Sequence, residues 1–124
     1  MIRVLLVEDS QVYRESLVFL LGRYEDLEVV GAVGDGGSAA RACAELGAEV
    51  VVLDYRLPDL DGAETAEEVR ARCPEAAVVF LSASAGEKEH DAARALGVPL
   101  VRKDEGLDRL VAAVRAVAGE RSSG

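Results

Sequence analysis

Acidic side chains follow directly after two apolar runs of the sequence. Glu8 and Asp9 come after the run at residues 2–7, and Asp54 comes after the run at residues 49–53. If both runs are parallel strands, their carboxyl ends meet at one edge of the sheet and bring the three acids together. Carboxylates gathered in this way repel one another unless a cation lies among them. The pattern therefore predicts a site for a hard divalent cation, which oxygen ligands favour.

Magnesium is the cation that this predicted site suits best. Mg²⁺ takes six oxygen ligands, keeps several waters, and is held by one or two carboxylates together with phosphate oxygens. Asp9 and Asp54 are the expected carboxylate ligands, Glu8 reaches a metal-bound water or the edge of the site, and the backbone carbonyl of Arg56 lies in the same loop. A free carboxylate oxygen of Asp54 would be placed for in-line attack on a phosphoryl donor, with an aspartyl phosphate as product.

Two more polar residues follow later apolar runs and belong to the same predicted edge. Ser82 comes after the run at residues 78–81, and Lys103 comes after the run at residues 98–101. Lys103 offers a point charge for phosphoryl oxygens, and Ser82 offers a hydroxyl donor that can turn toward them. We therefore expect three acids, one hydroxyl and one cation to converge.

Each of these residues also has an ordinary structural interpretation. Asp54 could cap the loop that leads into the next helix, and Ser82 or Ser84 could serve only as a helix N-cap. Lys103, taken alone, could be a solvated lysine. The occurrence of Glu8, Asp9, Asp54 and Lys103 at the same predicted edge favours the functional interpretation.

The elements that must position these residues alternate strictly along the chain. Short β-branched runs predict strands at residues 2–7, 27–33, 49–53, 78–81 and 98–101. Helical spacing of apolar residues predicts helices at residues 11–21, 38–46, 63–72, 86–96 and 107–118. Five such units predict an α/β protein with a flavodoxin-like (βα)5 fold, a doubly wound parallel five-stranded sheet of order 2-1-3-4-5. We expect residues 1–118 to form one domain and residues 119–124 to begin a linker or disordered tail.

Composition and charge exclude several classes of function. The 124 residues are 50% hydrophobic and 30% charged, which is typical of one folded domain. A formal net charge of −9 disfavours direct contact with nucleic acid or with an anionic membrane surface. The sequence contains no apolar run of about 20 residues and no signal-peptide pattern, so we expect a cytoplasmic protein.

The remaining residues with reactive side chains favour structural roles. Cys43 and Cys73 lie in apolar helical patterns without a CxxC motif, which indicates small core thiols rather than a disulfide or a zinc site. His90 lies among charged residues and has no adjacent nucleophile to serve, so histidine-based catalysis is disfavoured. Its neighbours Glu87, Lys88, Glu89 and Asp91 are interpreted as a solvated helix face.

One family combines these positions in this order. The chain resembles the receiver domain of bacterial two-component response regulators at Glu8, Asp9, Asp54, Pro58, Gly62, Ser82 and Lys103. The resemblance implies that Asp54 accepts a phosphoryl group from the phosphohistidine of a sensor histidine kinase. It also implies Mg²⁺ as cofactor, a phosphoacceptor domain rather than an enzyme, and a second copy of the chain as partner in a homodimer.

The other site residues receive their roles from the same resemblance. Asp9 and the carbonyl of Arg56 match the metal ligands, with Asp54, and Glu8 matches the second acid of the site. Ser82 matches the switch hydroxyl, and Lys103 matches the lysine of the family. The side chain of Arg56 lies where it can reach over the phosphoryl group, which predicts an influence on the rate of hydrolysis.

Finer features are similar to the subfamily with a LuxR/NarL-type helix-turn-helix output. The segment 54–59 and the pair Lys103-Asp104 carry this similarity. It implies control of transcription through an output domain outside residues 1–124, while a stand-alone receiver stays an alternative. Leu100 stands where the family often has an aromatic residue, and the connection at residues 97–100 is about one residue short. These departures favour, as the runner-up, a degenerate receiver that switches protein interactions without phosphorylation.

Two enzyme or carrier classes fit less well. A magnesium-dependent phosphatase with an aspartyl nucleophile would want a second acid two residues after Asp54, where Arg56 stands. A flavin or nucleotide carrier would want a Gly- or Thr-rich loop after the first strand. The chain has Glu8, Asp9, Ser10 and Gln11 there, and two acids repel a phosphate group.

Overall fold

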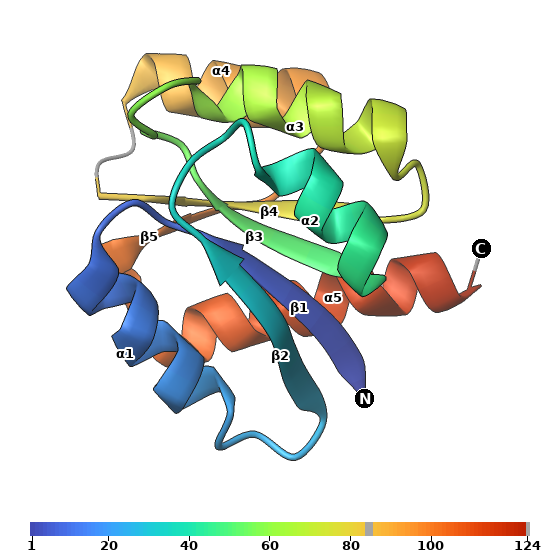
Figure 1. Cartoon of the computed structure of the whole chain (residues 1–124). Coiled ribbons are helices and arrows are strands. Elements are labelled where there is room, and N and C mark those ends of the chain that lie inside the picture. Colours follow the sequence, from blue (N-terminus) through green and yellow to red (C-terminus); the bar gives the residue numbers. More distant parts are fainter. Residues whose placement is uncertain (84–85, 124) are drawn as a thin grey trace.

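Five parallel strands form a single sheet in the order β2-β1-β3-β4-β5 (Figure 1). The computed structural model describes residues 1–83 and 86–123, and the side chains of residues 1–83 and 86–119. The strands are β1 (Ile2–Val7), β2 (Leu27–Val33), β3 (Val50–Asp54), β4 (Ala77–Ser82) and β5 (Leu100–Arg102). The helices are α1 (Gln11–Leu21), α2 (Ala39–Leu46), α3 (Gly62–Arg72), α4 (Glu87–Leu96) and α5 (Leu107–Ser123). The predicted strand order and doubly wound fold are confirmed.

Helices cover both faces of the sheet because the central strands are apolar on both sides. Val4 and Leu6 of β1 pack with residues of α1 and α5, whereas Leu5 and Val7 pack with residues of α2, α3 and α4. The same alternation runs through β3 and β4. Figure 1 shows the resulting layers, with α1 and α5 on one face and the other three helices on the opposite face. Burial of both faces explains why these strands are continuous apolar runs rather than alternating ones.

N-cap residues mark the start of the two helices that follow β1 and β3. Ser10 caps α1 as predicted, with the backbone N–H of Tyr13 donating to Ser10 Oγ over 3.3 Å. Asp61 caps α3, and Glu64 bonds back to the backbone N–H of Asp61 in a capping box. Gly62 permits this turn, because a Cβ atom at residue 62 would lie 2.8 Å from the Cα of Tyr55.

Three features of the last part of the chain differ from the prediction. The fifth strand covers residues 100–102 instead of 98–101, because α4 ends in a left-handed turn at Gly97 and the N–H of Val98 bonds back to Ala93. A short 3₁₀ helix, η1 (Lys103–Glu105), was not predicted. The last helix continues to Ser123, because a single glycine at residue 119 weakens a helix without ending it.

The described helices show no membrane-spanning character. Within residues 1–83 and 86–123, none combines the length with the apolar sequence that a bilayer crossing requires.

Candidate functional site

The structure brings Glu8, Asp9 and Asp54 together at the carboxyl edge of the sheet. Strands β1 and β3 are direct neighbours, and Val7 pairs with Leu53, so the residues that follow them lie side by side. One carboxylate oxygen from each of the three acids lies within 4.8 Å of the others. Glu8 and Asp54 are buried, whereas Asp9 is exposed. The cluster therefore has two acids in its floor and one at its rim.

Lys103 bridges the two buried acids. Its Nζ lies 2.6 Å from Glu8 Oε1 and 3.0 Å from Asp54 Oδ2. Lys103 begins η1 directly after β5, an edge strand separated from β3 by β4, so its long side chain reaches across the carboxyl edge. The ammonium group also lies 4.4 Å from the ring centroid of Tyr13, on α1. Elements from both ends of the chain thus hold this cation.

The second oxygen of each buried acid is bound to the backbone. The N–H of Ser10 donates to Glu8 Oε2 over 2.9 Å, and the N–H of Arg56 donates to Asp54 Oδ1 over 3.0 Å. These bonds fix both carboxylates so that their other oxygens face Lys103. Asp54 does not cap the following helix, a role that belongs to Asp61. Asp54 does bind the backbone of the loop that leads to α3, as its ordinary interpretation expects, and its other carboxylate oxygen contacts Lys103.

Charge in the cluster remains unbalanced. Three carboxylates face one ammonium group, which leaves a formal charge of −2. Burial acts to lower the pKa of Lys103, but the hydrogen bonds and charges of Glu8 and Asp54 outweigh it, so this pKa lies above its usual value. Burial also raises the pKa of the Tyr13 hydroxyl, with a smaller opposing effect from Lys103. Oxygen donors with an excess negative charge of two suit a hard divalent cation.

The side chain of Arg56 contacts Glu89 on α4. Its guanidinium lies 3.5 Å from Glu89 Oε1 on α4, and the Arg56 side chain is 74% exposed whereas that of Glu89 is 5% exposed. The interpretation of Glu89 as part of a solvated helix face is wrong. Hydrogen bonds from backbone N–H groups at the start of α4, including that of Gly86, hold the pKa of Glu89 below its usual value, and Arg56 lowers it further. A glutamate three residues after the N-cap Gly86 is the sequence signal that could have indicated this role.

Ser82 lies on β4, which is next to β3, and Leu100 lies on β5, which is next to β4. Ser82 is the last residue of β4, is buried, and follows Leu81, which pairs with Asp54. Ser84, the alternative N-cap, lies outside the described residues. Leu100 begins β5, pairs with Phe80 and packs half-buried against the core beneath α2, α3 and α4. An aliphatic side chain thus takes the place where the family often has a ring.

Three residues that sequence reasoning missed support the site. Tyr13 lies beneath Lys103, and Arg14 donates to the backbone carbonyl of Glu8 over 2.7 Å. Asp59 accepts the N–H groups of Gly36 and Gly37, each over 2.8 Å, which ties the β3–α3 loop to the β2–α2 loop. These hydrogen bonds hold the pKa of Asp59 below its usual value. The one sequence signal for Tyr13 is its place one helical turn before the buried Leu17.

Comparison with known proteins identifies the family of the chain. Residues 4–115 match the family model of the response regulator receiver domain. The chain is 38% identical over 126 residues to the DNA-binding transcriptional activator DevR/DosR of Mycobacterium tuberculosis, an alignment that covers 98% of this chain and 57% of the activator. It is 39% identical over 130 residues to protein-glutamate methylesterase/protein-glutamine glutaminase 5 of Myxococcus xanthus, covering 95% of this chain and 37% of that protein.

A solved structure shows the same fold. The crystal structure of a LuxR-family two-component response regulator from Aurantimonas superposes with a TM-score of 0.88 at 28% identity, covering 96% of this chain and 86% of that one. The chain spans little more than half the length of DevR/DosR and about a third of the methylesterase, so the activities of those whole proteins are not carried over. The family match covers nearly all of the sheet and helices that form the acid cluster, and the chain belongs to the response regulator receiver domain family.

Proposed function

We propose that Asp54 accepts a phosphoryl group and that the chain acts as a phosphorylation-dependent switch. The observation that supports this most strongly is the contact between Lys103 Nζ and Asp54 Oδ2 at 3.0 Å, inside a cluster that contains two further acids. A carboxylate with a fixed orientation and a neighbouring cation is suited to attack a phosphorus atom.

The proposed reaction moves a phosphoryl group between two protein side chains. A carboxylate oxygen of Asp54 forms a bond to phosphorus as the P–N bond of a phosphohistidine breaks, and the released imidazole nitrogen takes up a proton. Lys103 stabilises negative charge on the phosphoryl oxygens, and Ser82, at the end of the next strand, donates a hydroxyl hydrogen bond to them. The product is an acyl phosphate on Asp54.

The donor set supports Mg²⁺ as the cofactor of this reaction. Asp9 and Asp54 would bind it directly together with the carbonyl of Arg56, and Glu8 would bind through water. When bound, the ion neutralises charge on the transferred group and orients it. Asp9 at the exposed rim and Asp54 in the floor are the two carboxylates available for this ligation.

Partners follow from the same proposal. The phosphoryl donor is a sensor histidine kinase, and the similarity to the DNA-binding transcriptional activator DevR/DosR supports a role in transcription control through an output domain. The switched state in this proposal is a homodimer. We place the protein in the cytoplasm and assign no nucleic-acid or membrane contact to these residues, given their net charge of −9. Residues 1–118 are the proposed receiver unit.

The test is phosphorylation by a small donor, read as intact mass. Incubation with acetyl phosphate and Mg²⁺ is expected to add about 80 Da, and chelation of Mg²⁺ is expected to suppress the gain. Asp54→Asn should abolish it, while Asp104→Asn, a control at an exposed acid beside Lys103, should keep it. Failure of the wild-type protein to gain mass with any donor would refute the proposal and favour a degenerate receiver.

A further inference from the structure

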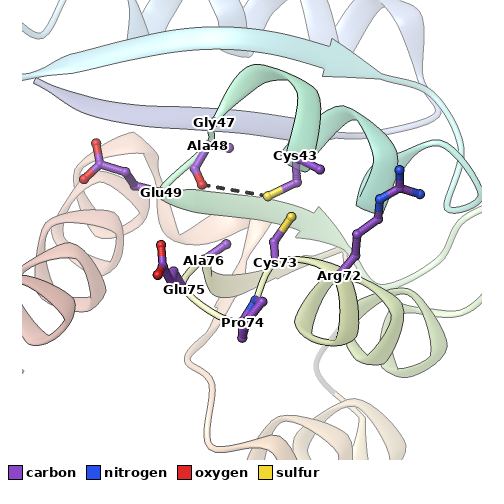
Figure 2. A pocket seen from close by; sticks show the side chains of 10 residues that line it. Cys43, Gly47, Ala48, Glu49, Arg72, Cys73, Pro74, Glu75 and Ala76 are labelled. Atoms are coloured by element: carbon purple, nitrogen blue, oxygen red, sulfur yellow. Dashed lines mark hydrogen bonds between the residues drawn. The ribbon is translucent and has the colours of Figure 1, made fainter.

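The two cysteines of the chain meet in a pocket far from the acid cluster (Figure 2). The pocket has a volume of about 440 Å³ and lies at the amino ends of β3 and β4, whereas Asp54 lies at the carboxyl end of β3. Its walls include Glu49, Arg72 and Pro74 in addition to both thiols.

One thiol comes from α2 and the other from the residue that caps α3, and both line the same pocket. Cys43 belongs to α2, and its Sγ lies 3.8 Å from the carbonyl oxygen of Ala48. Cys73 caps the end of α3, and its Sγ lies 3.8 Å from the carbonyl oxygen of Ala40. Ala40 is one helical turn before Cys43, so the sulfur of Cys73 reaches across to the helix that carries Cys43. Figure 2 shows the Sγ atom of Cys73 directed toward Cys43, whose own Sγ atom points to the carbonyl oxygen of Ala48.

The two thiols differ in access to solvent. Cys43 is 1% exposed, which agrees with the prediction of a small core thiol. Cys73 is half-buried and lines the open pocket beside Arg72 and Pro74. Cys43 and Cys73 are not joined by a disulfide in the structure. This arrangement has one thiol that a reagent can reach and one that can react only with its neighbour.

A metal ion is a poorer occupant for this pair. Structural zinc sites need four close ligands, and soft sites need at least the thiols and a further donor. Among the described residues, the group of three or more acidic, cysteine or histidine side chains with ligand atoms close enough for one ion is the acid cluster. Within the described part of the chain, the thiol pair is therefore not part of such a group of three.

We propose that Cys43 and Cys73 form a reversible intramolecular disulfide by exchange with a small disulfide such as oxidised glutathione. The thiolate of Cys73 attacks one sulfur of the reagent, whose S–S bond breaks and releases one thiol. The thiolate of Cys43 then attacks the Cys73 sulfur and releases the second thiol. Two protein S–H groups and one small disulfide become one protein disulfide and two small thiols, which balances atoms and electrons.

The disulfide would join α2 to the end of α3. It would close a loop between residues 43 and 73 and so restrict the unfolded chain. We therefore expect oxidation to raise Tm by roughly 5–10 °C, and reduction to reverse the increase.

The test is exposure of the folded protein to oxidised glutathione, with peptide mapping under non-reducing conditions. The expected product is about 2 Da lighter than the starting protein and yields a linked pair of peptides that contain Cys43 and Cys73. No change in mass, or a wild-type product that stops as a glutathione adduct, would overturn the proposal. Linkage that forms in denaturant but not in the folded protein would overturn it as well.

Single-cysteine variants separate the roles of the two thiols. Cys43→Ala is expected to accumulate an adduct about 305 Da heavier at Cys73, because no second thiol resolves it. Cys73→Ala is expected to stay unmodified, because Cys43 is buried. Equal reactivity of both variants while folded, verified by circular dichroism, would contradict the proposed order of attack. The wild-type peptide map decides the proposal even where a variant does not fold.

Discussion

A substitution that removes the ammonium group of Lys103 measures how much this cation stabilises the acid cluster. The variant Lys103→Met keeps a long apolar stem and deletes the charge that contacts Glu8 and Asp54. Both acids are nearly fully buried, at 2% and 5% exposure, so neither gains bulk solvent in exchange. The remaining carboxylates would face one another without a cation.

The size of the loss follows from burial and geometry. Removal of one partner from a buried ion pair costs about 3–5 kcal/mol of unfolding free energy, since the other charge stays buried and unpaired. The Lys103 side chain is 22% exposed, so water compensates part of this cost. We expect a loss of about 2–4 kcal/mol, which corresponds to a decrease in Tm of roughly 6–15 °C for a chain of this size.

Urea unfolding followed by circular dichroism measures this difference. Lys88→Met is the matched control, because Lys88 is the only other lysine of the sequence and lies exposed on α4. Mg²⁺ should recover part of the loss in Lys103→Met, since a cation in the cluster again separates the carboxylates. A stability equal to that of Lys88→Met within about 0.5 kcal/mol would refute the assignment of Lys103 as the central cation.

Four further substitutions test the site and the helices around it. Asp54→Asn is expected to raise the free energy of unfolding by roughly 0.5–2 kcal/mol, because it removes one of three repelling carboxylates and leaves Glu8 paired with Lys103. A lower free energy of unfolding in urea would contradict this expectation. The lowered pKa of Glu89 means that its contribution to stability is present above the unfolded pKa of about 4.3 and is lost as pH falls through the folded pKa. Thermal melts should therefore show Glu89→Gln less stable than wild type near neutral pH, with the difference vanishing in acid, and a difference that is constant with pH would argue against the ionised form. Gly62→Ala should lower the free energy of unfolding by about 1–3 kcal/mol, because the added Cβ atom would clash with Tyr55. Gly119→Ala, with open space around it, should raise the free energy of unfolding by about 0.5–1 kcal/mol. Equal melting temperatures of the two variants would show that the turn before α3 adjusts without cost.

Strands buried on both faces were the easiest part of the fold to predict. The runs Val4–Val7 in β1 and Val50–Leu53 in β3 are apolar and buried at every position, and only a two-sided environment accommodates such runs. The fifth strand was harder, because Val98 is as apolar and buried as a strand residue although it belongs to the turn that ends α4. An apolar residue indicates burial, but it does not show whether its backbone hydrogen bonds belong to a strand or to a turn.

The acids of the site could be predicted because topology alone brings them together. Parallel strands end at the same edge, so Asp9 and Asp54 were bound to be near each other once the strand order was known. Tyr13 and Glu89 could not be found in this way, because their roles depend on how α1 and α4 rotate and pack. The contact of Arg56 with Glu89 likewise depends on side-chain conformation.

The two ends of β3 carry chemistry of different kinds, and the strand between them keeps the two apart. A five-residue strand separates the amino-end pocket from the carboxyl-end acids by about 15 Å. Groups without shared partners at such a distance influence each other by less than about 0.5 kcal/mol. A disulfide between Cys43 and Cys73 would therefore change the stability of the chain while leaving the charges around Asp54 as they are. Phosphoryl uptake measured on the reduced and the oxidised protein should then agree, which makes the two proposals independently refutable on one sample.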